Sequence, residues 1–233
     1  MNLPLFFSEK LGELNETITL AEESSKHIIQ VLRMKMGEEL MLTNGEGYLL
    51  KATITDDHKK KTSVRIIQSQ LFPAPADKIS IAISLLKNGN RFEWFLEKAT
   101  ELGISEIIPL ICERTERQHF RMDRMKTILT SAMLQSQQSW LPKLVEPVKF
   151  VDVIHSVAHH QKFIAHCLDD AAKLDLKSIT QSGSRIIMIG PEGDFTANEI
   201  ALAKNQHFTP VSLGNTRLRT ETAGMVAAVL IRS

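Results

Sequence analysis

The spacing of apolar residues changes near residue 73, and this change constrains the fold more than any other feature of the chain. Before it, short apolar runs alternate with turn signals, as in Asn44-Gly45-Glu46-Gly47 between the runs at 39–43 and 48–55. This spacing predicts antiparallel strands joined by hairpins. Beyond residue 73, short apolar runs alternate with stretches whose apolar residues recur at helical spacing, which predicts alternating strands and helices.

Two prolines mark the change. Pro73 and Pro75 lack backbone N–H donors and bias their neighbours toward extended conformations, so they interrupt any regular element. A chain of 233 residues is long enough for two hydrophobic cores. We therefore expect a small β-rich domain at residues 1–72, with one helix from about Ser24 to Met34 and a further strand at 62–68, and an α/β domain at residues 73–233.

The α/β domain is expected to hold a mainly parallel sheet, because strand and helix patterns alternate along it. Its expected strands are residues 79–86, 104–112, 163–168 and 185–189, and its expected helices are 92–102, about 122–138, one opened by the capping box Thr196-Ala197-Asn198-Glu199, and one from about Thr220.

Composition excludes several classes of protein. With 43% hydrophobic and 24% charged residues, and no run near the ~18 apolar residues of a membrane span, a cytoplasmic globular protein that does not bind membranes is expected. Cys112 and Cys167 lie in apolar runs without a C-x-x-C pair, so both are expected to be buried, reduced thiols.

Basic residues cluster locally although the formal net charge is only +1. The clusters are Lys59-Lys60-Lys61, the arginines at 114, 117, 121 and 124, and the pair Arg217 and Arg219. Such patches can hold a polyanion. The lysine run is equally what a solvated hairpin tip contains, so the sequence leaves both interpretations open.

Two glycine turns stand out as candidate ligand sites. Ile189-Gly190-Pro191-Glu192-Gly193 and Ser212-Leu213-Gly214 each follow a short apolar run that is typical of a strand. Ligands of open α/β sheets bind beyond the carboxyl ends of strands, so both turns can offer backbone groups to an adenine or a ribose. Glycine turns are also often purely structural. Neither turn matches G-x-G-x-x-G or a phosphate-binding P-loop.

Arg219 and Glu221 precede a helix whose first residues, 223–228, include several small side chains. Small residues permit close helix packing within the chain or across a dimer. An arginine beside a ligand cleft can stabilise a developing anion, whereas Glu221 can simply favour the helix N-terminus. His155 and His159 would lie one helical turn apart, but no accompanying ligands indicate zinc, and no G-x-S-x-G elbow is present.

Together, these stretches resemble the RsmE-like 16S ribosomal RNA uracil-N3 methyltransferases of the SPOUT superfamily. The resemblance covers nearly the whole chain. It is carried by residues 27–33 with Gly37-Glu38, by 98–104 with Ile108-Pro109 and Glu113-Arg114, by Gln135 and Pro142, and by 189–193 and 213–223.

The resemblance implies a PUA-like β-barrel followed by a SPOUT α/β domain with a deep trefoil knot. Because threaded chains are rare, the residue pattern alone would not predict a knot. It implies a homodimer that acts on 16S ribosomal RNA or the small ribosomal subunit. It also implies that S-adenosylmethionine binds without a metal. The cofactor-binding residues expected from it are Leu168, Ile189, Gly190, Pro191, Glu192, Gly193, Leu213, Gly214 and Leu218.

N3 of uridine is a poor nucleophile while protonated, so the implied site must favour its anion. Arg219 is the expected anion stabiliser, with Glu221 positioning it or the helix start. Expected RNA contacts are Arg33, Arg114, Arg117 and Arg217. Departures from the family pattern are Asp194 in place of a glycine, Asn215-Thr216 in place of Pro-Arg, and Gln137-Gln138 at the end of the Gln135 motif. The alternatives are a SPOUT enzyme that methylates tRNA or a ribose 2′-hydroxyl, and a non-catalytic RNA-binding assembly factor.

Overall fold

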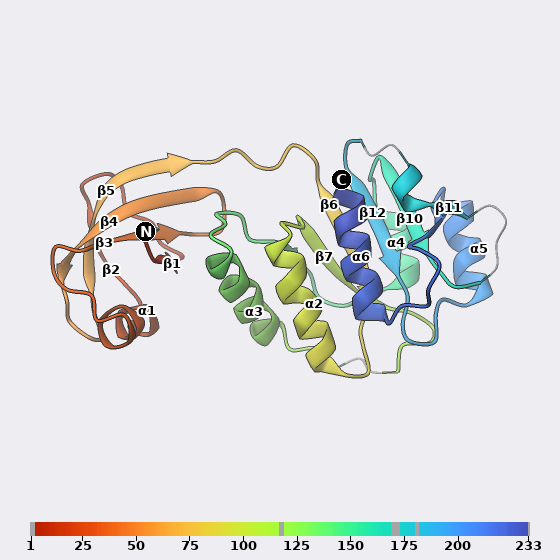
Figure 1. Ribbon diagram of the computed structural model, residues 1–233, viewed down its shortest axis with the longest axis horizontal. Helices are drawn as coiled ribbons and strands as arrows, with labels where there is room; N and C mark the ends of the chain where they lie inside the picture. The colour runs from red at the N-terminus through yellow and green to blue at the C-terminus, as the bar shows by residue number, and fades with distance from the viewer. Residues whose placement is uncertain (1–2, 117–118, 169–172, 180–181, 233) are drawn as a thin grey trace. The chain divides into compact units, whose positions relative to one another are not determined.

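The computed structural model describes residues 3–116, 119–168, 173–179 and 182–232 (Figure 1). The chain divides into two compact units, one made of residues 1–74 and 130–141 and the other of residues 75–129 and 142–233.

The first unit contains a five-stranded sheet in the order β1-β3-β4-β5-β2. Its strands are β1 (Leu5–Phe7), β2 (Thr17–Thr19), β3 (Glu39–Thr43), β4 (Tyr48–Asp56) and β5 (Ser63–Leu71). β1 pairs parallel to β3, and the other neighbours are antiparallel. Because β1 and β2 are the edges of this sheet as described, the unit is a half-barrel, whereas the resemblance implied a β-barrel.

The expected helix of this unit begins earlier and has a different geometry. It comprises α1 (Glu22–Lys26) and a π-helical turn η1 (His27–Val31), in which Leu32 N donates to His27 O at 3.0 Å. Ile28 is fully buried in the core beneath the sheet. The three lysines at 59–61 lie between β4 and β5, which confirms the hairpin tip.

A later part of the chain completes this unit. Residues 130–141 belong to it, and a β-bridge joins Trp140 to Glu46 in the turn between β3 and β4. The backbone also connects Leu141 N to Gly45 O at 2.8 Å. The turn therefore has a tertiary role that its hairpin signature alone does not indicate.

The second unit is built on a sheet in which every described pairing is parallel, as expected. The strand order is β11-β13-β10-β12-β6-β7-β8, with β9 also paired to β7. Its strands are β6 (Ile79–Ser84), β7 (Glu106–Ile111), β8 (Lys143–Leu144), β9 (Val148–Lys149), β10 (Gln161–Ala165), β11 (Leu174–Asp175), β12 (Arg185–Ile189) and β13 (Thr209–Ser212). The helices are α2 (Gly89–Glu101), α3 (Met122–Gln135, which ends in the first unit), α4 (Phe150–Ser156), α5 (Ala197–Asn205) and α6 (Thr220–Arg232), with a short 3₁₀ turn η2 (Leu176–Ser178).

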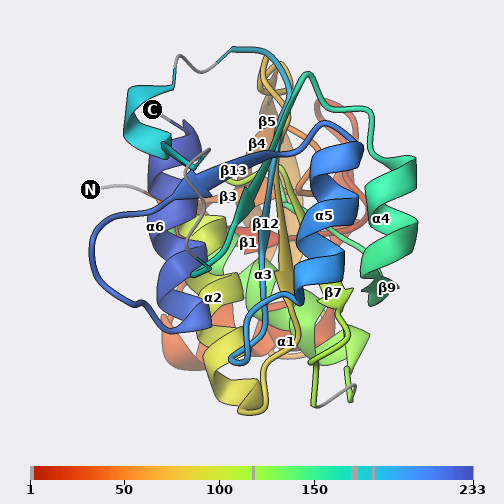
Figure 2. The same cartoon turned by 90° about the vertical axis from the view of Figure 1, so that its right-hand side faces the viewer.

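Helices cover both faces of this sheet. Figure 2 shows α2 and α6 on one face and α4 and α5 on the other, in agreement with the packing of α2 on α6 and of α4 on α5. Successive strand residues point to opposite faces, so Ile186 and Met188 of β12 enter the core under α4 and α5. On the other face, Gly224 brings α6 close to Phe95 and Ile83. The core thus holds the carboxyl ends of β10, β12 and β13 in place.

Candidate ligand pocket at the carboxyl edge of the sheet

A cavity of about 910 Å³ opens at the carboxyl edge of the parallel sheet. Because β10, β12 and β13 are parallel neighbours or near neighbours, the turns that follow them meet at this edge. The cavity is lined by residues 165–168, 189–194 and 211–220, together with Arg91, Arg114, Lys173 and Ala223. Its volume falls in the range of about 300–1,000 Å³ that is usual for small-molecule sites.

The residues expected to bind a cofactor are brought together here. All of them line this one cavity: Leu168, Ile189, Gly190, Pro191, Glu192, Gly193, Leu213, Gly214 and Leu218. Arg114, Arg217 and Arg219 line it as well. The two glycine turns therefore line a single cleft, in agreement with their expected placement beyond the carboxyl ends of strands.

The turn after β12 is attached to three other strand ends. Glu192 Oε1 accepts a hydrogen bond from Lys87 N, beyond β6, at 3.0 Å. Arg114 Nη1, beyond β7, donates to Gly193 O at 2.7 Å. Asp194 Oδ2 accepts from Cys167 N, beyond β10, at 2.7 Å. These bonds fix the walls of the cavity before any ligand enters.

The same turn leads into α5 through the predicted capping box. Thr196 and Glu199 exchange the two capping hydrogen bonds, which confirms where the helix begins. Glu199 Oε1 also accepts from Glu113 N at 2.9 Å, and Thr196 Oγ1 donates to Glu113 Oε2 at 2.9 Å. The helix start is thus joined to the end of β7, which further restrains the turn.

The glycines of the two turns have steric reasons to be glycine. A Cβ on Gly190 would lie 3.1 Å from both the backbone nitrogen and a ring carbon of Phe195. Gly214 has a φ of +132°, a conformation that side chains rarely adopt. The structural interpretation of these glycines is therefore correct, and it is compatible with a ligand in the cleft.

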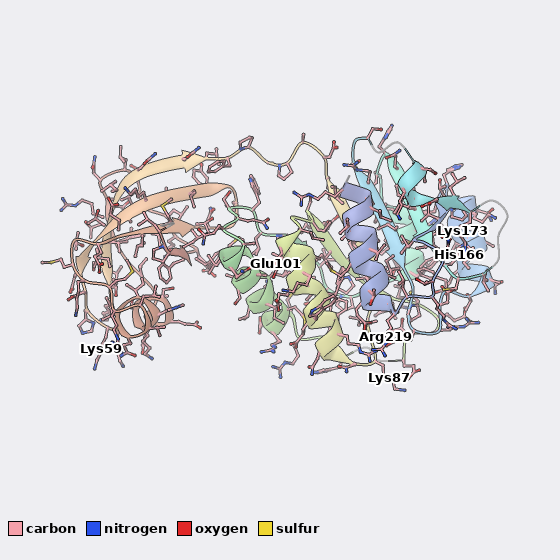
Figure 3. All side chains as sticks on the ribbon, viewed as in Figure 1. Lys59, Lys87, Glu101, His166, Lys173 and Arg219 are labelled. Carbon is pink, nitrogen blue, oxygen red and sulfur yellow. The ribbon has the colours of Figure 1, made fainter. Side chains whose placement is uncertain are left out.

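Among the described residues that line the cavity, cationic side chains outnumber carboxylates. Its cationic side chains are Arg91, Arg114, Lys173, Arg217 and Arg219, whereas its carboxylates are Glu192 and Asp194. Arg219 lies at the start of α6 (Figure 3). The surplus of positive charge suits an anionic group or a base that becomes anionic.

Glu221 does not line the cavity. It is buried, and its carboxylate lies 3.6 Å from Arg91 Nε. Glu221 is thus connected to the cavity by its ion pair with Arg91, a lining residue that the sequence did not single out.

The other residues expected to contact RNA are placed differently. Arg33 is exposed in the first unit, two residues after the end of η1, with a φ of +57°. Arg117 lies outside the residues that the structure describes. Arg124, from the same arginine cluster, forms an ion pair with Glu93 at 2.8 Å.

The expectation of two buried thiols is wrong for Cys167. Cys112 is buried, and desolvation raises its pKa to about 12. Cys167 is exposed and lines the cavity, because β10 ends at Ala165 and the thiol belongs to the turn beyond it. Both cysteines are free, as expected.

The proposed helical spacing of His155 and His159 is also wrong, because α4 ends at Ser156. His159 instead lies 2.8 Å from Ser80 Oγ, which donates to Glu106 at 2.8 Å. Burial is the main cause that lowers the pKa of His159. Among the described residues, no group of three or more His, Cys, Asp or Glu side chains is arranged to hold a metal ion.

Sequence reasoning missed the contacts of His166 and Lys173 at the cavity wall, where they lie next to each other (Figure 3). Lys173 Nζ donates to the carbonyl oxygens of His166 at 2.8 Å and Leu168 at 2.9 Å. A single lysine in a polar segment carries no periodic signal, so the sequence offered no means of finding it.

No helix in the described part of the chain is long and apolar enough to cross a membrane.

Family comparisons cover most of the chain. Residues 73–232 match the family described as RNA methyltransferase domain, and residues 20–67 match the RNA methyltransferase PUA domain. The ribosomal RNA small subunit methyltransferase E of Synechocystis is 32% identical over 228 residues, which span 94% of this chain and 74% of that protein.

Solved structures agree with this relationship. A probable rRNA-methyltransferase from Porphyromonas gingivalis superimposes with a TM-score of 0.91 at 34% identity, over 99% of this chain and 97% of that one. The ribosomal RNA small subunit methyltransferase E of Neisseria gonorrhoeae, solved with S-adenosyl methionine bound, gives a TM-score of 0.88 at 26% identity, over 99% of this chain and 97% of that one.

Proposed function

The chain belongs to the RsmE family of small-subunit ribosomal RNA methyltransferases, and from this premise we propose that it methylates N3 of a specific uridine in 16S ribosomal RNA. Methylation of ribosomal RNA with S-adenosylmethionine is the activity of the family. The target atom, the dimer and the knot, together with the roles of individual residues, are parts of the proposal.

One observation carries the assignment of the site. The nine residues that the resemblance implies for the cofactor come from three strand ends far apart in sequence, and all of them line the same cavity. The backbone of these turns is held by the side chains of Glu192, Arg114 and Asp194. The cavity therefore offers fixed amide and carbonyl groups, which suit the adenosine part of the cofactor.

When bound, S-adenosylmethionine supplies a methyl group already activated by its sulfonium. The protein must then hold the uridine base beside the cavity and favour loss of the N3 proton. Arg219 lines the cavity at the start of α6, and its permanent positive charge would stabilise the N3 anion. Glu221 would act as a positioning residue through its ion pair with Arg91.

The RNA would be held by cations around and beyond the cavity. Arg114 and Arg217 line its wall, and Arg33 lies exposed on the half-barrel unit. Phosphate contacts of this kind position RNA without reading its sequence. Arg117 belongs to the same proposal, although it lies outside the described residues.

The test is a methyl-transfer assay followed by identification of the product nucleoside. Small ribosomal subunits from cells lacking this protein are incubated with the pure protein and labelled S-adenosylmethionine, and the digested RNA is separated by chromatography and mass spectrometry. We expect label in 3-methyluridine of 16S RNA. Label in a 2′-O-methyl nucleoside or only in tRNA would support the other SPOUT enzymes, and cofactor binding without transfer would support an assembly factor.

Arg219→Ala should lower turnover by about 100-fold or more, with little change in the affinity for the cofactor. Arg232→Ala is the matched control, because Arg232 is an exposed arginine at the far end of the same helix. Equal turnover by the two variants would remove Arg219 from the catalytic role.

A homodimer is supported by the outer face of α6. Thr222, Met225, Val226 and Val229 recur at the spacing of one helix face, and Val229 is 51% exposed. Met225 and Val226 are half-buried, so this face leaves apolar surface partly exposed, which favours burial against a second copy. Light scattering should give a dimer mass for the protein and a monomer mass for Val229→Glu; a monomeric wild-type protein would contradict the proposal.

A trefoil knot is supported by the strand order. β13 lies beyond β10, whereas α6 packs on β6 and β12, so residues 213–219 must return along the carboxyl edge past the turns after β10 and β12. In the proposed knot this segment passes through the preceding loop of chain. A crystal structure in which it stays outside that loop would contradict the knot.

A further inference from the structure

We propose that Asp194 and Lys173 act together as a charged clamp on residues 166–168, and that this clamp sets the affinity of the pocket for S-adenosylmethionine. Both are positioning residues that act through the backbone of this turn. The proposal rests on the proposed cofactor site, and it adds two positioning residues to those expected to contact the cofactor.

The turn at 166–168 needs such support because it extends beyond the sheet. The pairing of β10 with β12 ends at Ala165 and Ile189, and His166, Cys167 and Leu168 continue from there into the cavity wall. Leu168 is 48% exposed and Cys167 is exposed as well, so a hydrophobic core does not hold their side chains. His166 is buried, whereas Cys167 and Leu168 depend on polar contacts of their backbone for their position.

Asp194 supplies the contact to the amide side of the turn. Its Oδ2 accepts from Cys167 N at 2.7 Å, and its Oδ1 accepts from Phe195 N at 2.8 Å. Hydrogen bonds with an ionised acceptor are stronger than neutral ones. The first of these bonds joins residues 27 positions apart, so it connects the β12 turn directly to the β10 turn.

Lys173 supplies the contact to the carbonyl side. Its ammonium group donates to the carbonyl oxygens of His166 and Leu168, at 2.8 and 2.9 Å. The carboxylate thus binds an N–H and the ammonium binds two C=O groups of the same three residues. Each charge meets the end of the peptide dipoles that attracts it, which favours one conformation of the turn.

The backbone conformation at position 194 indicates that the carboxylate of Asp194 has a role there. Its φ is +63°, in the left-handed region that glycine adopts freely and that other residues enter at a cost. Aspartate tolerates this region better than most residues when its carboxylate bonds locally. The two hydrogen bonds that the Asp194 carboxylate accepts from backbone N–H groups offset this cost. A glycine at this position could not form them.

The test is calorimetric titration of Asp194→Gly with S-adenosylmethionine. This variant is expected to fold, because glycine adopts the required φ without strain. Loss of the clamp should raise the dissociation constant about tenfold, the scale of one charge-assisted hydrogen bond. The dissociation constant of S-adenosylhomocysteine, which lacks the sulfonium charge, should rise by the same factor, because the clamp acts on the cavity wall and not on that charge.

Two further variants examine the two halves of the clamp. Asp194→Asn keeps one oxygen acceptor for Cys167 N, so it should recover part of the lost affinity. Lys173→Met removes the donors to the carbonyl oxygens and should also weaken binding. In both Asp194→Gly and Lys173→Met, hydrogen exchange should become faster in the peptide containing Cys167, and the loss of activity should lie mainly in the KM for the methyl donor.

Asp175→Gly is the matched control. Asp175 also accepts a hydrogen bond from a backbone amide, that of Lys177 at 3.1 Å, but within its own turn, and it does not line the cavity. Its removal should leave the affinity for both ligands unchanged.

The outcomes separate the clamp from the proposed function. Failure of the wild-type protein to bind S-adenosylmethionine would contradict the proposed site itself. Tight binding by the wild type and equally tight binding by Asp194→Gly would overturn the clamp alone. If Asp194→Gly lost affinity for S-adenosylmethionine but not for S-adenosylhomocysteine, the clamp would also be overturned, because Asp194 would then be acting on the charge of the cofactor.

Discussion

Alkylation of Cys167 offers a direct probe of the pocket, because this thiol is exposed and lines the cavity. We predict that iodoacetamide labels Cys167 in the free protein and that S-adenosylmethionine protects it. A ligand that fills the space between the turns after β10, β12 and β13 would cover this part of the wall.

The two cysteines should differ greatly in reactivity. Cys112 is buried with a pKa of about 12, so at pH 8 about one such thiol in ten thousand is ionised, and only the thiolate reacts. A single adduct should therefore form, at Cys167. At a cofactor concentration of about 100 times Kd, roughly 1% of the sites remain free, and labelling should slow about 100-fold.

The assay is intact-mass spectrometry over time, with peptide mapping to locate the adduct. Cys167→Ser should take up no label, which checks the assignment. An unchanged labelling rate of Cys167 at saturating S-adenosylmethionine would refute the placement of the cofactor against this wall.

Three more predictions address packing, pH and RNA binding. Gly224→Ala should lower the free energy of unfolding in urea by about 1 kcal/mol, because its Cβ would lie 2.7 Å from the buried ring of Phe95 and this overpacking exceeds the helix-propensity gain; an unchanged midpoint would contradict the tight contact. The lowered pKa of His159 means that protonation favours the unfolded chain, so stability should be retained above pH ~6.5 and fall below it, and a His159→Asn variant with the same pH slope would exclude His159 as the cause. Replacing Lys59 and Lys60 together by glutamate should weaken RNA binding and reduce its salt dependence if the hairpin tip contacts phosphate, and an unaltered salt slope would leave these lysines as a solvated tip.

The sequence predicted the elements that carry a local signal. The strands at 79–84 and 185–189 and the capping box at Thr196 lie where apolar runs and capping residues placed them. Strands of two or three residues, such as β1 and β8, were missed because so short a stretch carries no periodicity. The π-helical turn was missed because an apolar stripe does not distinguish it from an α-helix.

The site could be predicted only in part for the same reason. Glycine turns after strands are visible in a sequence, and in a parallel sheet their meeting at one edge follows from topology. The bonds that fix the cavity join residues far apart, as in Asp194 with Cys167 and Arg91 with Glu221. No local pattern specifies such pairs, so these contacts became visible only in the fold.

A crystal structure of the protein grown with S-adenosylmethionine would test the central claim most directly. We expect electron density for the methyl donor between the turns at 189–194 and 211–219, with adenosine against backbone atoms and the methyl group facing the side of Arg219. Density for the donor elsewhere on the protein, with these turns unoccupied at saturating ligand, would contradict the account.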